Sequence, residues 1–371
     1  MTSPPRTLLH VFPNFEVGGA QIRFVQLANH FGARYRHLIV AMDGRTAARA
    51  LLTERVTAEM LDPGARRGQT LANVTRFAAI LRRHRPDLLV TSNWGSIEWA
   101  MANAMAGVPH LHMEDGFGRE EADGQIARRV WTRRLTLRRA TVLLPSQTLC
   151  AIARAQWRIP EDNLIYVPNG IDCMRFAGEP DWQFAASLGL PPGDPVIGTV
   201  AGLRAEKNLR RLIDAFAIVQ RQRPARLALV GEGPERAALA RHAADLGVAE
   251  RVIFTGNCPE PERLLPCFAV FALSSDTEQM PLSVLEAMAA ARPVASTDVG
   301  DVRIMVAVEN RQHIVARDTQ ALAEALLALL SDTSLAAGIG AANQRRAREQ
   351  FSQERMFGAF ENLFDGGVVR R

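Results

Sequence analysis

Two basic side chains lie three residues apart in the segment Gly202–Asn208, where Arg204 and Lys207 follow a predicted strand and precede a predicted helix. The backbone N–H groups at a helix N-terminus add positive potential beside such side chains. Two cations at the positive end of a helix suit a diphosphate. The same pair is also common at an ordinary solvated helix start, so this segment alone leaves both interpretations open.

Two carboxylates, Glu278 and Glu286, lie eight residues apart. Pro281 fits the first turn of a helix, which places Glu278 in the preceding loop and Glu286 in the second turn. Carboxylates at these places can bind two hydroxyl groups of one ligand, while the first-turn N–H groups face a phosphate. Those N–H groups belong to Leu282, Ser283 and Val284. Either glutamate alone is equally explained as a solvated residue or as an acidic group favourable to the helix dipole.

Two glycine pairs follow predicted strands, where they would let a backbone approach a ligand closely. Gly231 and Gly233 come after the strand that ends at Val230, and Gly18 and Gly19 come after the first strand of the chain. Each pair is a weak signal by itself, because any tight turn uses glycine.

Lysine is almost absent from this sequence. Of the 44 basic residues, only Lys207 is a lysine, and all the others are arginines. The simplest explanation is a codon bias towards arginine. A single remaining lysine can then mark a position where the planar guanidinium does not substitute for the compact ammonium.

Short apolar runs alternate with amphipathic stretches in both halves of the chain. Strands are expected at 8–12, 37–41, 87–91, 141–145 and 164–167, and again at 196–200, 226–230, 252–255, 270–273 and 294–296. Helices are expected at 20–31, 71–84, 209–222, 235–246 and 281–290. This alternation predicts an α/β protein with two Rossmann-like parallel-sheet domains, at 1–168 and 169–350. In such sheets, ligands bind outside the carboxyl ends of the strands, so two facing domains would form a cleft.

Charge and composition limit the possible functions. Residues 1–168 hold 22 basic and 14 acidic residues, whereas residues 169–371 hold 22 and 25, which suggests two domains with different partners. No run of 18 apolar residues predicts a transmembrane helix, and the first 15 residues lack the apolar core of a signal peptide. The cysteines lack metal-site spacing and are expected to be buried thiols, as in a cytoplasmic protein.

The stretch Arg128–Arg139 is strongly basic and also contains Trp131, Leu135 and Leu137. A basic amphipathic helix can bind an anionic membrane surface, which predicts a peripheral membrane association. An ordinary solvated arginine face is an equally good interpretation. No nucleic-acid-binding motif accompanies the charge, so a nucleic acid partner is not expected. The arginines concerned are Arg128, Arg129, Arg133, Arg134, Arg138 and Arg139.

Taken together, the segments above resemble the retaining glycosyltransferases of family 4, which have the GT-B fold. Glu278 and Glu286 match the family's Glu-x7-Glu pattern, and Arg204 with Lys207 match its diphosphate-binding pair. Further landmarks are Gly18-Gly19-Ala20, the segment Val167–Asp172, Phe254-Thr255-Gly256 and the segment Phe351–Glu354. The resemblance covers nearly the whole chain.

The resemblance implies transfer of a sugar from a nucleotide-diphosphate sugar to a glycan or lipid-linked acceptor, with retention at the anomeric carbon. It implies that Glu286 binds the ribose, that Glu278 lies beside the donor sugar, and that Arg204 and Lys207 offset charge on the leaving diphosphate. The Gly18 loop would close over the phosphates, and residues 351–371 would form a helix that crosses back to the first domain. No Asp-x-Asp triplet occurs, so no metal or other cofactor is expected.

Three departures from the family pattern leave alternatives open. Gln279 and Asp301 stand where the family usually has glycine, and Asp115 occupies the position of the family's active-site histidine. An ionised aspartate accepts a hydrogen bond from a sugar hydroxyl but donates none. His112 would reach the same place from two residues earlier, or would be a buried histidine. The alternatives are a nucleotide-sugar-binding protein with lost or altered catalysis, or another GT-B enzyme such as a sugar-nucleotide epimerase.

Overall fold

The computed structural model describes residues 4–117, 121 and 124–367. The chain divides into two compact units, and each is treated separately below. The N-terminal unit consists of Met1–Asn169 together with Met356–Arg371, and the C-terminal unit consists of Gly170–Arg355.

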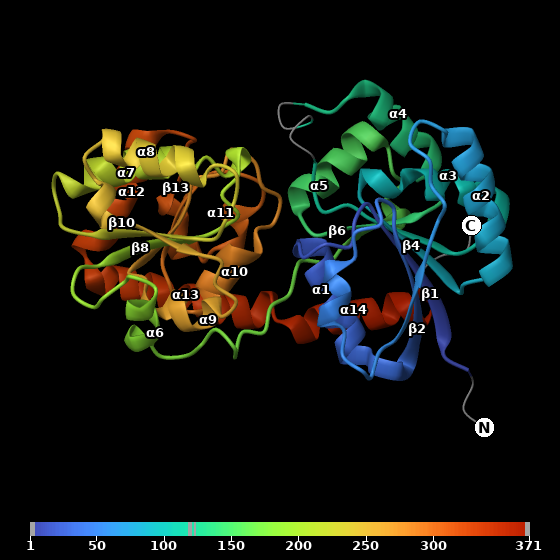
Figure 1. Cartoon of the computed structure of the whole chain (residues 1–371), viewed down its shortest axis with the longest axis horizontal. Coiled ribbons are helices and arrows are strands. Elements are labelled where there is room, and N and C mark those ends of the chain that lie inside the picture. The colour runs from blue at the N-terminus through green and yellow to red at the C-terminus, as the bar shows by residue number, and fades with distance from the viewer. Residues whose placement is uncertain (1–3, 118–120, 122–123, 368–371) are drawn as a thin grey trace. The chain divides into compact units, whose positions relative to one another are not determined.

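The N-terminal unit is built on a sheet of seven parallel strands in the order β3-β2-β1-β4-β5-β6-β7 (Figure 1). Its strands are β1 (Arg6–Phe12), β2 (Tyr35–Ala41), β3 (Thr57–Leu61), β4 (Leu88–Ser92), β5 (His110–Met113), β6 (Thr141–Leu144) and β7 (Leu164–Tyr166). Its helices are α1 (Gly19–Phe31), α2 (Thr70–His84), α3 (Ile97–Ala106), α4 (Ala127–Thr136), α5 (Gln147–Ile152) and α14 (Gln353–Asn362). The strand order reverses between β1 and β4, which is where open sheets of this kind bind ligands.

The last helix, α14, packs against the N-terminal unit rather than the unit that precedes it in sequence. Its apolar side chains Met356, Phe357 and Phe360 join a buried cluster with Leu8 of β1 and Tyr35 of β2. A hydrogen bond also joins this part of the chain to β2, where the Tyr35 hydroxyl donates to Asp365 Oδ1 at 2.7 Å. The predicted crossing of the C-terminal helix to the first domain is therefore confirmed, while residues 368–371 of the expected tail lie outside the described residues.

The C-terminal unit has a sheet of six parallel strands in the order β10-β9-β8-β11-β12-β13. Its strands are β8 (Val196–Val200), β9 (Arg226–Val230), β10 (Val252–Gly256), β11 (Val270–Leu273), β12 (Val294–Thr297) and β13 (Ile314–Val315). Its helices are α6 (Trp182–Ser187), α7 (Leu209–Gln220), α8 (Arg236–Asp245), α9 (Pro261–Leu264), α10 (Leu282–Ala289), α11 (Val302–Met305), α12 (Thr319–Ser331) and α13 (Thr333–Gln350).

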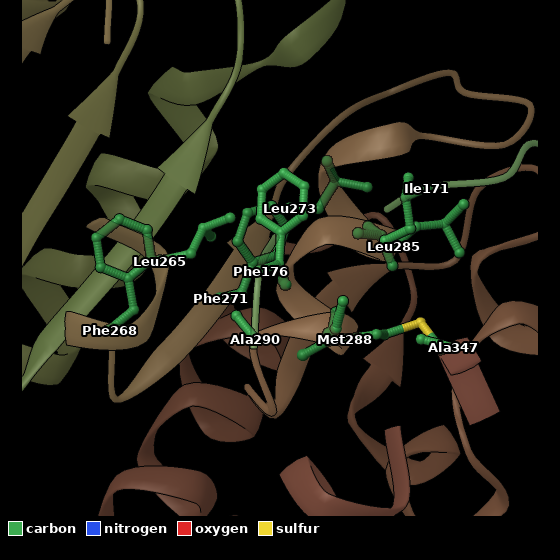
Figure 2. Packing of buried hydrophobic residues seen from close by; sticks show 14 of the residues in the cluster. Ile171, Phe176, Leu265, Phe268, Phe271, Leu273, Leu285, Met288, Ala290 and Ala347 are labelled. Carbon is green, nitrogen blue, oxygen red and sulfur yellow. The ribbon is translucent and has the colours of Figure 1, made fainter. Parts of the chain in front are cut away.

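Figure 2 shows the buried cluster that seats α10 against this sheet. Leu285 and Met288 on the inner side of α10 share one core with Phe271 and Leu273 of β11. This packing fixes the rotation of α10 about its axis, so the position of Glu286 on the helix is also fixed. The other sheet face carries a second core, formed with α7, α8 and α12.

The prediction of two Rossmann-like parallel-sheet domains is confirmed. The sequence analysis missed β3, β5 and β13. No single helix in the described part of the chain has both the length and the apolar character needed to cross a bilayer, although α12 and α13, bent by 102°, reach that threshold when taken together.

Candidate active site

The lone lysine and the first glutamate of the Glu-x7-Glu pattern are in direct contact. Lys207, in a short 3-10 turn after β8, places its Nζ 2.5 Å from Glu278 Oε1 in the loop after β11. The Ser275 hydroxyl donates to the same carboxylate oxygen at 2.8 Å. The Lys207 side chain is only 18% exposed, so the ammonium is held in a defined place before any ligand binds.

The loops after β8 and β11 are joined by further hydrogen bonds. Asn208 begins α7 in the left-handed region, with φ of 40°, and its Nδ2 donates to Asp276 Oδ2 at 3.1 Å. Arg211 of α7 forms an ion pair with Asp276 at 2.7 Å and donates to the Ser274 carbonyl at 2.8 Å. The sequence analysis missed these positioning residues, although the polar run Ser274–Asp276 directly after a strand was a usable signal. These contacts order the backbone that carries Lys207 and Glu278.

The second predicted cation lies in a different environment. The Arg204 side chain is 59% exposed and its Nε lies 3.2 Å from Glu206 Oε1. The Arg204 carbonyl accepts a hydrogen bond from the Lys207 N–H at 3.0 Å, but within the described residues the Arg204 guanidinium forms no hydrogen bond or ion pair with Lys207 or Glu278. The Arg204 side chain is therefore separate from the Lys207–Glu278 pair, and its role at a diphosphate remains a prediction.

Helix α10 presents both an open N-terminus and a partly buried carboxylate. Pro281 is its N-cap, and within the described residues no side chain caps the helix. The first-turn N–H groups of Leu282 and Ser283 thus lie at the positive helix end. One turn later, Glu286 is partly buried, and burial raises the pKa of its carboxyl to about 7, although the field of Arg175 opposes this rise. In the part of the chain that the structure describes, the Glu286 carboxylate forms no hydrogen bond, so its two oxygens are available to a ligand.

Gly300 holds the Glu278 segment in place from the loop after β12. It has a φ of +52°, and a Cβ at this position would lie 2.5 Å from the carbonyl oxygens of both Glu278 and Gln279. Asp301 contributes its backbone N–H, which donates to the Gln279 carbonyl at 2.8 Å. Asp301 thus takes part in the packing of this loop even though the family usually has glycine there.

Gly231 and Gly233 have a structural explanation within the protein itself. A Cβ on Gly231 would lie 2.1 Å from the Ala201 carbonyl oxygen, and one on Gly233 would lie 2.3 Å from that of Leu203. The two glycines therefore allow the loop after β9 to pack on the loop after β8. This packing does not test whether the two glycines also contact a ligand, so that contact stays a prediction.

In the N-terminal unit, Gly18 and Gly19 stand where α1 begins after β1. Gly18 is the N-cap with an extended backbone, and no side chain among the described residues caps this helix. A Cβ on Gly18 would lie 2.9 Å from Gln21 Oε1, the end of a flexible side chain that can move aside, so packing within the protein does not require glycine here. The helix start is open to a ligand, as the resemblance requires, but closure over a phosphate remains a prediction.

Asp115 is engaged by an arginine that the sequence analysis did not single out. Arg23 on α1 lies 2.6 Å from Asp115 Oδ1 and donates to Oδ2 at 2.9 Å, and it also donates to Asn169 Oδ1 at 2.9 Å. The Arg23 side chain is almost completely buried, whereas Asp115 is partly exposed. A basic residue on an otherwise apolar helix face was the available signal. The carboxylate of this pair retains lone pairs for a hydroxyl donor.

His112 lies inside the N-terminal unit rather than at its surface. Its side chain is fully buried, with Nδ1 2.8 Å from the Thr91 hydroxyl and Nε2 3.7 Å from Glu114 Oε2. The same hydroxyl lies 2.8 Å from His110 Nε2, and burial lowers the pKa of His110 to about 3. Substrate contact by His112 stays a prediction, but the buried-histidine interpretation describes its surroundings.

The arginines of the basic stretch differ in exposure, because one of them is buried and the others reach solvent to different extents. Arg133 is 1% exposed, and the rings of Trp94 and Trp157 pack over its guanidinium. This guanidinium lies 3.2 Å from the buried carboxylate of Glu114. The solvent-facing part of the stretch contains Arg128, Trp131, Leu135, Arg138 and Arg139.

Neither a metal cluster nor a disulfide is found in the described part of the chain. No group of three or more His, Cys, Asp or Glu side chains with metal-binding geometry occurs there. Cys150, Cys173 and Cys267 are buried, and none of the four cysteines forms a disulfide.

Comparison with known proteins agrees with this geometry. The family model "Glycosyltransferase Family 4" matches residues 17–175, and the model "Glycosyl transferases group 1" matches residues 194–332. The chain belongs to glycosyltransferase family 4. Among solved structures, HepE of Anabaena in complex with UDP and glucose superposes with a TM-score of 0.83 at 20% identity, over 97% of this chain and 99% of that one, which establishes the GT-B fold.

Two curated relatives of this family 4 chain illustrate the range of its sequence similarity. The 2-deoxystreptamine N-acetyl-D-glucosaminyltransferase of Streptomyces fradiae is 27% identical over 83% of this chain and 82% of its own length. The GDP-mannose-dependent alpha-(1-6)-phosphatidylinositol monomannoside mannosyltransferase of Mycolicibacterium smegmatis is 34% identical over 52% of this chain and 53% of its own length. Other curated relatives likewise match over about half of their length.

Proposed function

We propose that this chain is a retaining glycosyltransferase that moves a sugar from a nucleotide-diphosphate sugar to a glycan or lipid-linked acceptor in cell-envelope or exopolysaccharide synthesis. The observation that carries the proposal is the 2.5 Å contact between Lys207 and Glu278, three residues before the N-cap of α10. A cation that is already ordered beside the site stabilises a leaving diphosphate once it exchanges its carboxylate partner for the phosphate oxygens. The retaining course rests on the match of Glu278 and Glu286 to the family pattern.

The proposed roles follow from the local chemistry of the C-terminal unit. Glu286 accepts hydrogen bonds from the ribose hydroxyls, because its carboxylate has no partner in the described residues. The N–H groups at the start of α10 bind a phosphate, and Lys207 transfers its contact from Glu278 to the leaving diphosphate. Glu278 is then released to accept hydrogen bonds from the donor sugar, while the exposed Arg204 swings onto the phosphates. No metal ion is required in this scheme, since cationic side chains supply the charge.

A second candidate function is nucleotide-sugar binding without transfer, and the ion pair of Asp115 favours it. The family's histidine is replaced here by a carboxylate whose two oxygens already contact Arg23. A histidine can donate a hydrogen bond to a sugar, whereas this pair offers only an acceptor. Release of nucleoside diphosphate from a donor separates the two functions, because a binding protein releases none.

We also propose that the solvent-facing part of the Arg128–Arg139 stretch binds the anionic inner face of a membrane. Trp131 and Leu135 are 60% and 77% exposed, and Arg128 and Arg139 lie in the same stretch. Exposed apolar side chains among arginines suit an interface with anionic lipid headgroups. This placement would bring a lipid-linked acceptor to the N-terminal unit.

Vesicle co-sedimentation tests the membrane contact. The variant Arg128→Glu with Arg139→Glu is expected to bind anionic vesicles less than the wild type. A control of equal charge, Arg49→Glu with Arg83→Glu, alters two other exposed arginines of the same unit and is expected to bind normally. Equal losses in both variants would indicate only a net-charge effect, and no loss in either would contradict the proposal.

A thermal-shift screen with UDP, GDP, ADP and their sugars tests the donor site itself. HepE was solved with UDP, whereas the mycobacterial relative is named as GDP-mannose-dependent, so the base has to be found by experiment. A ligand present at 100 times its dissociation constant adds about 2.7 kcal/mol to the stability of the folded protein. A stabilising nucleotide sugar whose effect is lost in Glu286→Ala is the expected result. Absence of stabilisation by every nucleotide would contradict the proposed donor site.

A further inference from the structure

The carboxylate of Glu278 has two partners, and both of them contact the same oxygen. Lys207 Nζ lies 2.5 Å from Oε1, and the Ser275 hydroxyl donates to Oε1 at 2.8 Å. The other oxygen, Oε2, forms no hydrogen bond within the described residues. One oxygen is therefore held from two sides, while the other is open to a ligand.

Ser275 is the less mobile of the two partners. It follows β11 directly and is 1% exposed, and its carbonyl accepts a hydrogen bond from the Thr297 hydroxyl at 2.7 Å. Thr297 is itself fully buried at the end of β12. A serine hydroxyl sits on a short side chain, whereas the lysine ammonium ends a flexible four-carbon stem. The Ser275 hydroxyl is thus able to keep its place when the other contacts of Glu278 change.

Lys207 is the partner that can leave. Its side chain is 18% exposed, and its backbone is held separately, since the Ser274 hydroxyl donates to the Lys207 carbonyl at 3.0 Å. In the proposed function, this ammonium exchanges its carboxylate partner for the oxygens of a diphosphate. If the ammonium were the only partner of Glu278, the carboxylate would lose its anchor at the moment when it has to meet the donor sugar.

We propose that Ser275 is a positioning residue, which holds Glu278 by Oε1 while Lys207 exchanges onto the diphosphate and Oε2 accepts from a hydroxyl of the donor sugar. The inference rests on the proposed function and adds a residue that acts through Glu278. A carboxylate that is already oriented binds the sugar without first losing rotational freedom.

A comparison of two ligands separates positioning from a purely structural role. Glu278 is assigned to the sugar and not to the nucleotide, so Ser275→Ala should weaken binding of a nucleotide sugar about tenfold, by loss of one oriented hydrogen bond to a charged group. Binding of the corresponding nucleoside diphosphate should be unchanged. Isothermal titration calorimetry of the full chain with UDP, GDP, ADP and their sugars measures both. Equal losses for the two ligands, or no loss for either, would overturn the proposal.

A matched control removes a different buried hydroxyl. Ser296 is fully buried on β12, and its hydroxyl donates to the Thr297 carbonyl at 2.7 Å instead of to Glu278. Ser296→Ala is expected to bind the nucleotide sugar and the nucleoside diphosphate like the wild type. The same selective loss of nucleotide-sugar binding in this variant would contradict the assignment to Ser275.

A double-mutant cycle tests whether Ser275 acts through Glu278. Glu278→Ala removes the carboxylate that Ser275 is proposed to hold. In this background, Ser275→Ala is expected to have no further effect on the affinity for the nucleotide sugar, because the two residues act as one unit. Additive losses would show that Ser275 acts elsewhere and would contradict the proposal.

The single lysine supplies a signal for the exchange itself. The full chain labelled with ¹³C-lysine has one ¹³Cε resonance, that of Lys207. The nucleoside diphosphate is expected to shift this resonance saturably in the wild type and in Ser275→Ala alike, since Lys207 meets the diphosphate in both. Loss of the shift in the variant would indicate a general disturbance of the loops, which would contradict a positioning role.

The same titrations separate this inference from the proposed function. If no nucleotide binds the wild type, the donor site is refuted, and the role of Ser275 is refuted with it. If nucleotides bind and shift the Lys207 resonance, but Ser275→Ala binds the nucleotide sugar as tightly as the wild type, the donor site stands and only the role of Ser275 is wrong.

Discussion

Glu286 makes nucleotide binding sensitive to pH, and the size of the effect follows from its surroundings. Burial raises the pKa of this carboxyl to about 7 in the unliganded protein. The ionised carboxylate accepts hydrogen bonds from two ribose hydroxyls, whereas the protonated form loses one acceptor position. The ionised fraction falls from about 90% at pH 8 to about 10% at pH 6, so the dissociation constant of a nucleotide sugar should rise about tenfold over this range.

Isothermal titration calorimetry with a nucleotide sugar measures this directly, because a diesterified diphosphate keeps the same charge between pH 6 and pH 8. The control is Glu286→Gln, which keeps the shape of the side chain and removes its titration. This variant should bind more weakly at pH 8, by roughly 1.5–3 kcal/mol for each charged hydrogen bond that is lost. Its affinity should also be constant with pH. The reasoning is refuted if wild type and variant show the same pH dependence.

The same pKa predicts a change in stability with a definite sign. The folded protein binds a proton at Glu286 below about pH 7, whereas the unfolded chain binds it only below the ordinary value of 4.5. The unfolded state therefore holds fewer protons between these values, and stability falls as pH rises through this window. Glu286→Gln should raise the Tm of the unliganded protein at pH 8 but hardly at pH 5, by a free energy of order 1–3 kcal/mol. An equal effect at both pH values would contradict the burial argument.

Four further outcomes are expected. Lys207→Arg should lower kcat about tenfold with an unchanged circular dichroism spectrum, because the guanidinium is larger than the space that the compact ammonium fills. Wild-type kinetics in this variant would indicate that the single lysine has no functional cause. Gly300→Ala should lower the unfolding free energy by about 1–3 kcal/mol in urea titration, owing to positive φ and backbone overlap, whereas Gly338→Ala, with open space around it and a helical backbone, should be neutral or stabilising. Asp115→Asn should lower the unfolding free energy by about 3 kcal/mol in the same urea titration, because it leaves the buried charge of Arg23 unbalanced. An unchanged urea midpoint would contradict a stabilising role for this ion pair. Chelation with EDTA should leave nucleoside diphosphate release unchanged, and restoration of lost activity by Mg²⁺ would reveal a metal requirement.

The parallel-sheet architecture could be predicted because buried strands are continuous apolar runs, as in Val270–Leu273. The missed strands lack that signal. Thr57–Leu61 is an edge strand with partly exposed side chains, and His110–Met113 carries two buried histidines whose rings both hydrogen-bond to Thr91 of a neighbouring strand. Their burial depends on partners that are distant in sequence, so local patterns could not show it.

The candidate site was predictable where the spacing along one helix decides the geometry, and not where contacts cross between elements. The positions of Glu278 and Glu286 around the start of α10 follow from the intervening proline. By contrast, the pairing of Lys207 with Glu278 joins loops 71 residues apart. The burial of Arg133 could not be predicted, because its partner Glu114 and its aromatic neighbours come from other elements.

The stereochemistry of donor cleavage tests the central claim most directly. Each nucleotide sugar that stabilises the protein would be incubated with the wild type and with Lys207→Arg, and the released sugar would be followed by ¹H NMR before its anomers equilibrate. The account predicts release of nucleoside diphosphate together with a first-formed sugar of the same anomeric configuration as the donor, and slower release by the variant. Binding without any release, or a first-formed sugar of inverted configuration, would contradict it.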